Sequence, residues 1–470
     1  MSKINKFFKA MKHFIKNNKL LIVIFFLTLA YKVAIHLTYN SNFADLNYTD
    51  RTAYNFVRGL GFFSDVDHFD FLRQHFYPWL FPIGYLYKIV ATKAWPFLIT
   101  ATMVSLIAYP IIKIAKEKLN KKEVFFFSVF LVSSYFFRHL MFEDIHGELF
   151  MTALLSWIIY YLSKNNDKQA ILLTLLLPLC KENFISVAGA VSIYFFFKGK
   201  RKASLFVAVY SIIATLLIFK VYYVLINNGS YMFMDRYAAS SKIQLFMSLF
   251  NADKFAYLLI LLLPYGLLPL FSSYTLLGLG IVTQNLLSTY LGQYTFYTHY
   301  NFPLIPVIAV SSIFGYLRLK QNKRFMRFLV ITLSFFFVIN ILAFIFLEAR
   351  YFTNPRPYIS ETRHIRKIVG PIASIEACEW SMMHYSYRPK WDRIRNCEAQ
   401  YVILKRPIMV TPEEYKKLPI SKKISALFYG EIQGQGLRDE FNKTLVNVKK
   451  THTLIWDQNL LLFKKKESMP

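Results

Sequence analysis

The chain has 470 residues, of which 55% are hydrophobic, 18% aromatic and 18% charged. Soluble domains carry about 45–50% apolar and about 25% charged residues. Long runs of Phe, Ile and Leu do not fit one or two soluble cores, so the composition excludes an ordinary cytosolic enzyme, a disulfide-rich secreted module and a disordered protein. The formal net charge of +29 leaves two explanations, nucleic-acid binding or membrane topology.

Apolar stretches recur along the chain, and most have roughly the 20 residues that cross the hydrocarbon of a bilayer. They lie at 20–38, 95–115, 124–140, 147–163, 169–180, 184–197, 203–225, 255–272, 275–288, 302–317 and 328–347. The pair at 169–180 and 184–197 is short, which indicates helices that are broken or packed deep in protein. We therefore predict a mainly α, polytopic membrane protein with about eleven spans.

Basic residues set the orientation of these spans. The leader at 1–19 contains lysines and no acidic residue, so the positive-inside rule places it in the cytoplasm. Alternating from there brings the short basic loops to that same side, at 116–122, 164–168, 198–202 and 320–327. Because the basic loops all fall on one side of the predicted spans, membrane topology explains the positive charge better than nucleic-acid binding does. We expect no nucleic-acid partner. We predict a multi-pass protein of the cytoplasmic (inner) membrane, with the C-terminal part outside.

Two regions fall outside the membrane on this topology. The transmembrane domain, 20–348, contains a long outer loop at 39–94, in which the apolar stretch 77–90 is short and holds two prolines. We expect a juxtamembrane or re-entrant helix there. The tail, 349–470, alternates helical patterns with strand-like runs such as ASIEA, AQYVILK and TLIWDQNLLLF, which predicts a small extracytoplasmic α/β domain. Within it, Cys378 and Cys397 either form a disulfide or remain free thiols.

Ionisable residues gather at the predicted outer face. Inserting one ionisable side chain to the depth of the bilayer costs about 2.5–3.5 kcal/mol. A cluster of such residues therefore indicates a functional site. The turn MFEDIHGELF offers Asp144, His146 and Glu148 as ligands, and a helical turn would put Asp144 and Glu148 on one face. With an acid from the first loop they would suit Mg²⁺ or Mn²⁺. The alternative is a hydrogen-bonded helix cap without metal.

The pair Lys181–Glu182 lies in the turn between the two short stretches. Lys181 could contact a phosphate, or the pair could only hold two short helices together. A leaving phosphate develops charge that a metal or a basic side chain can stabilise. The candidates for substrate and phosphate binding are Arg51, His75, Arg138, Lys181, Glu182, Arg236 and His299.

Several strings of this chain occur in the order seen in a known family: FADLNYTDRTAYNF, QHFYPWLFPIGYLY, FEDIHGELF, LLLPLCKENF and THYNFPLIPVIA. They resemble a family of predicted bacterial membrane proteins named domain of unknown function 2079. Its hallmark Asp-x-His-Pro-Glu corresponds to residues 144–148, with Gly147 in place of the proline. Its Lys-Glu pair corresponds to Lys181–Glu182, and its His-Tyr pair to His299–Tyr300.

That family in turn resembles the GT-C glycosyltransferases, multi-span enzymes that take sugars from polyprenyl-phosphate carriers outside the cytoplasm. The resemblance implies an essential acid just after the first span, which is Asp45 here, with Asp50 as second candidate. It also implies metal-binding acids in the next outer turn, where Asp144 and Glu148 lie. We note that this step from family to reaction rests on fold-level analogy.

The reaction expected on this basis needs a carboxylate base for an acceptor hydroxyl, and direct displacement would invert the anomeric centre. The leading hypothesis is therefore a glycosyltransferase with a polyprenyl-phosphate-linked sugar donor and an envelope glycan, lipid or protein as acceptor. The alternative is a transporter or flippase for a lipid-linked or anionic solute, which would place charges near mid-membrane at broken helices. A third reading makes the tail a binding module on a membrane scaffold.

Overall fold

The computed structural model divides the chain into two compact units, residues 1–33 with 70–345 and residues 34–69 with 346–470. Helix α2 (Lys19–Leu37) runs from the first unit into the second. The structure describes residues 5, 18–37, 43–64, 69–227, 231, 233–237, 251–295, 298–345, 359–370, 373–377, 391–393, 399–405, 435–457 and 460–466.

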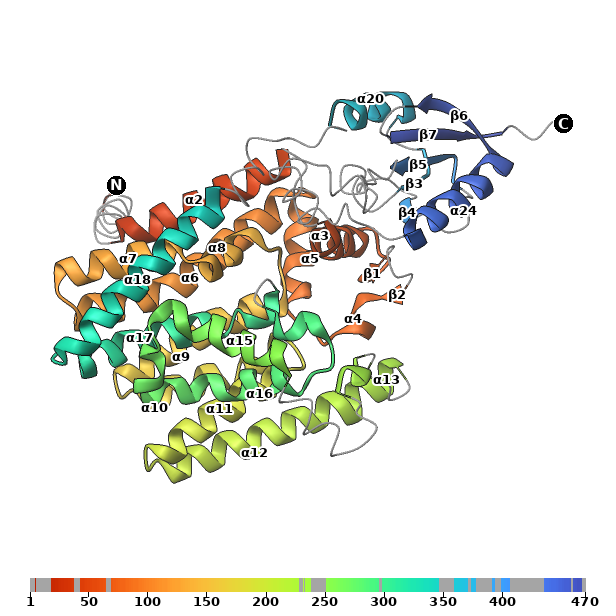
Figure 1. The fold of residues 1–470 in the computed structure, drawn as a ribbon. Coiled ribbons are helices and arrows are strands. Elements are labelled where there is room, and N and C mark those ends of the chain that lie inside the picture. Colours follow the sequence, from red (N-terminus) through yellow and green to blue (C-terminus); the bar gives the residue numbers. More distant parts are fainter. Residues whose placement is uncertain are drawn as a thin grey trace. The chain divides into compact units, whose positions relative to one another are not determined.

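The first unit is built from helices (Figure 1). After α2 they are α4 (Phe71–Gln74), α5 (Leu80–Ile89), α6 (Ala94–Lys118), α7 (Lys121–Ser133), α8 (Tyr135–Phe142), α9 (Gly147–Ser163), α10 (Asp167–Thr174), α11 (Phe184–Phe197), α12 (Arg201–Leu217), α13 (Tyr223–Asn227), α15 (Ala252–Leu262), α16 (Leu279–Leu287), α17 (Leu304–Leu319) and α18 (Lys323–Ala343). Short 3-10 turns join several of them: η1 (Leu177–Leu179), η3 (Met234–Tyr237), η5 (Leu268–Phe271) and η8 (His299–Asn301).

Within the described residues, four helical segments are long and apolar enough to cross a membrane: 19–37, 94–118, 201–227 and 323–343. Helices α7 and α8 pass the same test together, although they bend by 54°, and would make a fifth span. Helices α9, α11 and α17 are apolar but shorter. A mainly helical membrane protein with several apolar spans is therefore confirmed, whereas the predicted count of about eleven is not confirmed.

Local sequence explains where these helices start and break. Asn120 and Glu123 form a capping box at the start of α7. Ser134 has an extended backbone, and its hydroxyl accepts a hydrogen bond from the Phe137 amide at 3.4 Å, so the chain bends there and begins α8. Between α10 and α11 the chain leaves the α-helix, and Pro178, which has no N–H to donate, lies in η1. The short, broken helices predicted at 169–197 are thus present, and Lys181 and Glu182 lie at the break.

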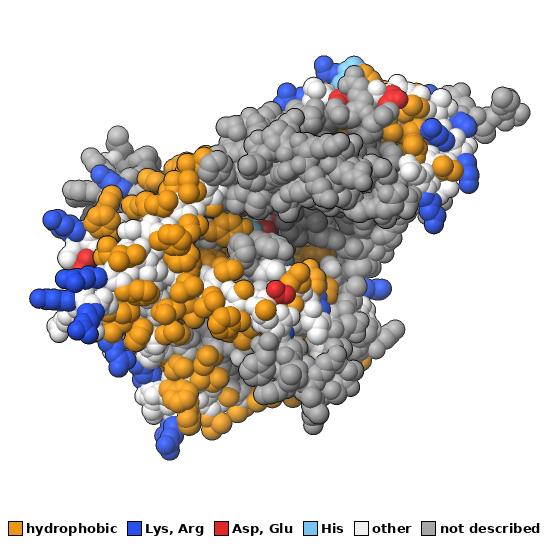
Figure 2. Space-filling view, viewed as in Figure 1, with side chains coloured by type: hydrophobic (Ala, Val, Ile, Leu, Met, Phe, Trp, Pro, Cys, Tyr) orange, Lys and Arg blue, Asp and Glu red, His pale blue; other side chains and the backbone are white. Residues whose placement is uncertain are grey.

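The basic turns all lie at one end of the helical unit. Helices α6, α9, α11 and α17 run toward turns that carry Lys and Arg, and α7, α10, α12 and α18 run back from them (Figure 1). Figure 2 shows Lys and Arg side chains at that end and hydrophobic side chains over the face formed by α2 and α18. Phe26 of α2 and Ile331 and Phe335 of α18 are exposed, as expected for contact with lipid.

The second unit contains α3 (Phe43–Val57), α20 (Ile359–Val369), α24 (Gln435–Thr451) and a five-stranded sheet. The strands are β3 (Ile375–Ala377), β4 (Trp391–Arg393), β5 (Tyr401–Lys405), β6 (His452–Asp457) and β7 (Leu460–Lys465), in the order β4-β3-β5-β7-β6. The pairings of β3 with β4 and β5 are parallel, and β7 pairs antiparallel with β5 and β6. A short pair, β1 (Phe63–Ser64) and β2 (Phe69–Asp70), lies at the unit boundary.

The sheet confirms the strand-like runs of the tail, and α20 is a helix between the apolar helices and the first of these strands in the chain, in agreement with the predicted mixture of helices and strands. Val402, Leu404 and Phe463 are buried in its core, together with Val448 of α24. Cys378 and Cys397 lie outside the described residues, and Cys180 of the helical unit is a buried free thiol.

Gly315 lets α17 pack directly against η5. A Cβ at this position would lie 2.0 Å from the backbone oxygen of Leu268, so neither segment can yield by turning a side chain. Small residues allow such close approach between helices in membranes. Gly189 of α11 is a useful contrast, because a Cβ there would meet no atom within 4 Å.

We predict that Gly315→Ala lowers the free energy of unfolding of the detergent-solubilised protein by about 1–3 kcal/mol, the usual cost of overpacking. Gly189→Ala should leave it unchanged or raise it by about 0.5–1 kcal/mol, because alanine favours helix. Thermal unfolding of both variants measures the difference. Equal stabilities would contradict the close packing of α17 on η5.

Candidate functional site

Ionisable side chains form a buried layer at the end of the first unit opposite the basic turns. Glu148 lies in the first turn of α9, Lys181 and Glu182 lie just before α11, and His299 opens η8. Glu148 and Glu182 are each 1% exposed and Lys181 is 3% exposed. The N-terminal ends of α9, α11 and α17 therefore bring together groups that are far apart in sequence.

Lys181 and Glu148 form the central ion pair of this layer. The Lys181 Nζ donates to Glu148 Oε1 at 2.7 Å, and Asn183 Nδ2 lies 3.5 Å from the same oxygen. The ammonium group also lies over two aromatic rings, 5.7 Å from the centre of Tyr77 and 5.6 Å from that of Tyr300. Burial lowers the pKa of Lys181, but Glu148 together with Tyr77, Glu182 and Tyr300 outweighs burial and holds that pKa well above its ordinary value. Lys181 is therefore a permanent buried cation.

Glu182 holds His75 by a second buried contact. The His75 Nδ1 lies 2.7 Å from Glu182 Oε1, and the carboxylate also accepts from the Phe76 amide at 3.1 Å and the Tyr231 hydroxyl at 2.8 Å. Burial lowers the pKa of His75, against a partial rise caused by Glu182. Burial raises the pKa of Glu182, but His75, Lys181 and the hydrogen bonds to the carboxylate together outweigh burial, so the pKa is lowered. A neutral imidazole thus donates through Nδ1 to an ionised carboxylate, leaving Nε2 as an acceptor.

Arg236 of η3 supplies a second cation next to Tyr300. Its Nη1 donates to the Tyr300 hydroxyl at 2.7 Å, and the guanidinium lies 3.9 Å from the ring centre of Phe233 and 4.6 Å from that of Tyr290. Burial raises the pKa of Tyr300, so the phenol remains neutral. Tyr300 therefore contacts Arg236 through its hydroxyl and Lys181 through its ring.

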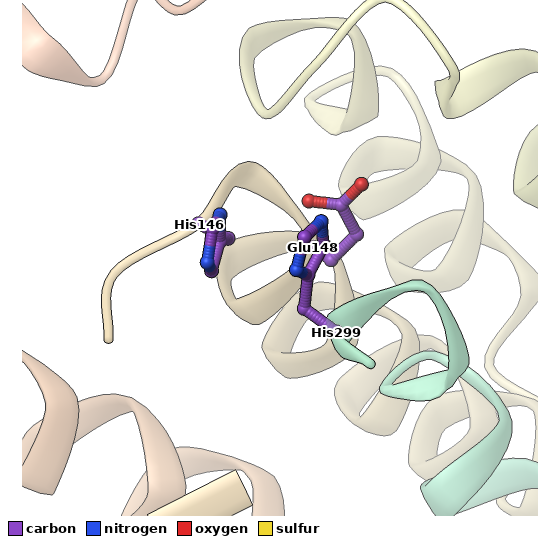
Figure 3. Close-up of side chains that lie close together, drawn as sticks. All are labelled: His146, Glu148 and His299. Carbon is purple, nitrogen blue, oxygen red and sulfur yellow. The ribbon is translucent and has the colours of Figure 1, made fainter. Parts of the chain in front are cut away.

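His146, Glu148 and His299 form the one group of three or more possible metal ligands found within the described part of the chain. Their ligand atoms all lie within 4.8 Å of one another, and the imidazole rings of His146 and His299 stack at 3.9 Å with an interplanar angle of 15°. Figure 3 shows the two rings side by side, with the Glu148 carboxylate next to them. His299, which sequence reasoning assigned to substrate binding, thus joins two predicted metal ligands.

Asp144 does not lie beside Glu148, as the predicted helical turn would have placed it. The backbone is extended at Glu143 and His146, and α9 starts only at Gly147, so Asp144 precedes the helix and does not share its face with Glu148. Its carboxylate pairs with Lys32 of α2, and Lys32 Nζ also donates to the carbonyl oxygens of Phe142 at 2.9 Å and Glu143 at 3.1 Å. Lys32 therefore closes the C-terminal end of α8.

The remaining predicted residues lie elsewhere. Arg138 of α8 binds the Ser133 carbonyl oxygen and lies 5.6 Å from the ring centre of Phe344. Asp50 and Arg51 are buried in α3 of the second unit, and Arg51 lies 5.5 Å from the ring centre of Tyr54. Asp45 also belongs to α3, and its side chain lies outside the described residues.

Sequence reasoning gave no role to three residues that the structure adds to the layer: Tyr77, Asn183 and Tyr231. Asn183 directly follows the Lys181–Glu182 pair, so its position in the string CKENF is a usable signal. Tyr77 and Tyr231 are two of 32 tyrosines, and no spacing distinguishes them from the rest. Their role depends on tertiary contacts alone.

Gly147 explains how α9 approaches the break before α11. A Cβ at Gly147 would lie 2.5 Å from the Cys180 carbonyl oxygen and 2.8 Å from the Lys181 Cβ. Its absence lets the first turn of α9 lie against that segment, within reach of the Lys181 side chain. This contact thus depends on the absence of a side chain at Gly147.

The family described as "Predicted membrane protein (DUF2079)" matches residues 16–370, which is more than half of the chain. The chain belongs to this family. The match to DUF2079 includes the whole buried layer and α3, and it confirms a membrane protein, which resides in a lipid bilayer. No protein of curated function matches the chain.

We predict that Lys32→Met lowers the free energy of unfolding by about 3–5 kcal/mol, because it removes the cation that pairs with a carboxylate exposed by only 1%. The matched control is Lys200→Met. Lys200 pairs with Asp167 at 2.6 Å, but these side chains are 35% and 31% exposed, so its loss should cost about 0–1 kcal/mol. Titration with a denaturing detergent measures both, and equal effects would contradict a stabilising role for the buried pair.

Proposed function

We propose that this protein is a membrane glycosyltransferase that takes a sugar from a polyprenyl-phosphate-linked donor at the extracytoplasmic face. The observation that carries the proposal is how Arg236 is packed and hydrogen-bonded. Its guanidinium is packed against Phe233 and Tyr290 and bound to the Tyr300 hydroxyl, and no carboxylate pairs with it among the described residues. A positioned guanidinium that has no carboxylate partner among the described residues is suited to bind a phosphate.

The neighbouring charges support an anionic ligand at this place. Lys181 lies over the ring of Tyr300, and Arg236 binds the hydroxyl of the same residue. Glu148 pairs with Lys181, whereas no carboxylate pairs with Arg236 among the described residues. Fixed cations in a site that excludes water stabilise developing negative charge more strongly than they would in water. The phosphate of a departing lipid carrier develops such charge.

The proposed reaction is a single displacement at the anomeric carbon. The acceptor hydroxyl oxygen bonds to the anomeric carbon, the bond from that carbon to the carrier phosphate breaks, and the phosphate leaves with the electron pair. Asp45 takes the hydroxyl proton as general base, with Asp50 as second candidate; this assignment rests on the resemblance to GT-C enzymes. One displacement inverts the anomeric centre. The acceptor is an envelope glycan, lipid or protein.

We predict that Arg236→Gln raises KM for a polyprenyl-phosphate sugar by about 10- to 150-fold, which corresponds to the loss of a charged hydrogen bond of about 1.5–3 kcal/mol. The assay uses full-length protein in proteoliposomes with synthetic donors that carry different sugars. Arg201→Gln, at an exposed helix start, is the control. An unchanged KM would remove Arg236 from phosphate binding, and no transfer from any donor would refute the glycosyltransferase proposal.

In the same assay, Asp45→Asn should lower kcat by about 10²–10⁴-fold, the contribution of a general base. Asp167→Asn, which changes a partly exposed ion pair at the start of α10, should leave kcat unchanged. Full transfer by the Asp45 variant would overturn the assignment of the base while leaving the donor class intact.

A transporter or flippase for a lipid-linked or anionic solute is a second candidate, favoured by one observation. Lys181 and Glu182 lie where α10, η1 and α11 form a broken helix, and discontinuous helices often hold the substrate site of transporters. A fluorescent polyprenyl-phosphate lipid in the proteoliposomes distinguishes the two. Movement of the lipid between leaflets without sugar transfer would favour this candidate.

A further inference from the structure

We infer that His146, Glu148 and His299 form a binding site for a divalent transition-metal ion. The inference does not depend on the proposed glycosyl transfer, because it concerns only how these three side chains are arranged. Two imidazoles and one carboxylate converge from α9, from the residue that precedes it and from η8, with ligand atoms within 4.8 Å of one another (Figure 3).

Glu148 carries a second, independent indication of a ligand. Its Oε1 accepts from Lys181 at 2.7 Å, whereas Oε2 is buried and has no hydrogen-bond partner among the described residues. The residue is 1% exposed, so bulk water does not reach this oxygen. A buried acceptor without a partner costs about 1–3 kcal/mol, and a metal–oxygen bond would remove that cost. One carboxylate would then serve two cations, one through each oxygen.

The donor set decides the class of metal. Mg²⁺ and Mn²⁺ prefer oxygen ligands, whereas imidazole suits Zn²⁺, Cu²⁺, Fe²⁺ and Ni²⁺. The ligand set in the structure contains His299 where the sequence predicted Asp144. This second imidazole shifts the metal preference away from Mg²⁺. Asp144 is engaged by Lys32. Three protein ligands would also leave coordination positions open to water or substrate, as in catalytic rather than structural sites.

The surroundings agree with a bound cation. Glu143 Oε2 lies 3.9 Å from His146 Nε2, so a further carboxylate stands beside the paired imidazoles. Carboxylates next to metal-ligating histidines are a usual feature of such sites. In the alternative, the two stacked rings only pack against each other, and the protein binds no metal ion at this place.

The test uses full-length protein in detergent, purified through a tag without histidine and stripped with a chelator. Titration with Co²⁺, followed by visible absorption, should show about one bound ion per chain, and Mg²⁺ in large excess should not displace it. His146→Gln and His299→Gln should each weaken Co²⁺ binding at least about tenfold. His75→Gln, a buried histidine of the same layer outside the ligand set, should leave binding unchanged.

X-ray absorption of the Co²⁺-loaded wild type keeps the inference testable if a variant fails to fold. The spectrum should contain the scattering signature of two imidazoles. Absence of stoichiometric binding, full binding by both histidine variants or an all-oxygen shell would each overturn the site. Loss of binding in Asp144→Asn together with full binding in His299→Gln would instead assign the ligands to residues 144–148.

Discussion

The arrangement of the helical unit depends on how buried charges are matched, and the pair Lys181–Glu148 is the clearest case. Removing an ammonium and a carboxylate from water costs several kcal/mol each, and only close pairing offsets this. The 2.7 Å contact is possible because Gly147 brings the start of α9 against the break before α11. The position of two helices is thus tied to one ion pair, which also sets the place of Tyr77 and Tyr300 around the ammonium group.

Much of the fold follows from sequence patterns because those patterns are local. Hydropathy identified the apolar helices, the shortness of the stretches at 169–180 and 184–197 indicated a broken helix, and strand-like runs indicated β3, β5, β6 and β7. The number of spans could not be obtained in this way. An apolar stretch records only that a segment avoids water, and segments such as α9 and α17 avoid it largely by burial inside the protein.

The site was predictable in its members and less so in its pairings. Lys181, Glu182, Glu148, His146, His299, His75 and Arg236 were all selected from the sequence, and the structure brings them to one layer. Which acid meets which base depends on where α9 begins. Because the helix starts at Gly147, Asp144 turns to Lys32 while Glu148 turns to Lys181. A one-turn difference in a helix boundary, which sequence patterns do not fix, decides the ligand set.

The electrostatics of the layer also explain why acids and bases coexist at one end of an apolar unit. Glu148 lies in the first turn of α9 and Glu182 just before α11, where the positive end of the helix dipole stabilises carboxylates. These acids are therefore held by the backbone as well as by side-chain cations. Arg236 differs from Lys181 because no carboxylate pairs with it among the described residues, so it is the basic group that an anionic ligand would contact. A metal at His146, Glu148 and His299 would add positive charge to the same layer, so a bound cation and a bound phosphate would reinforce each other.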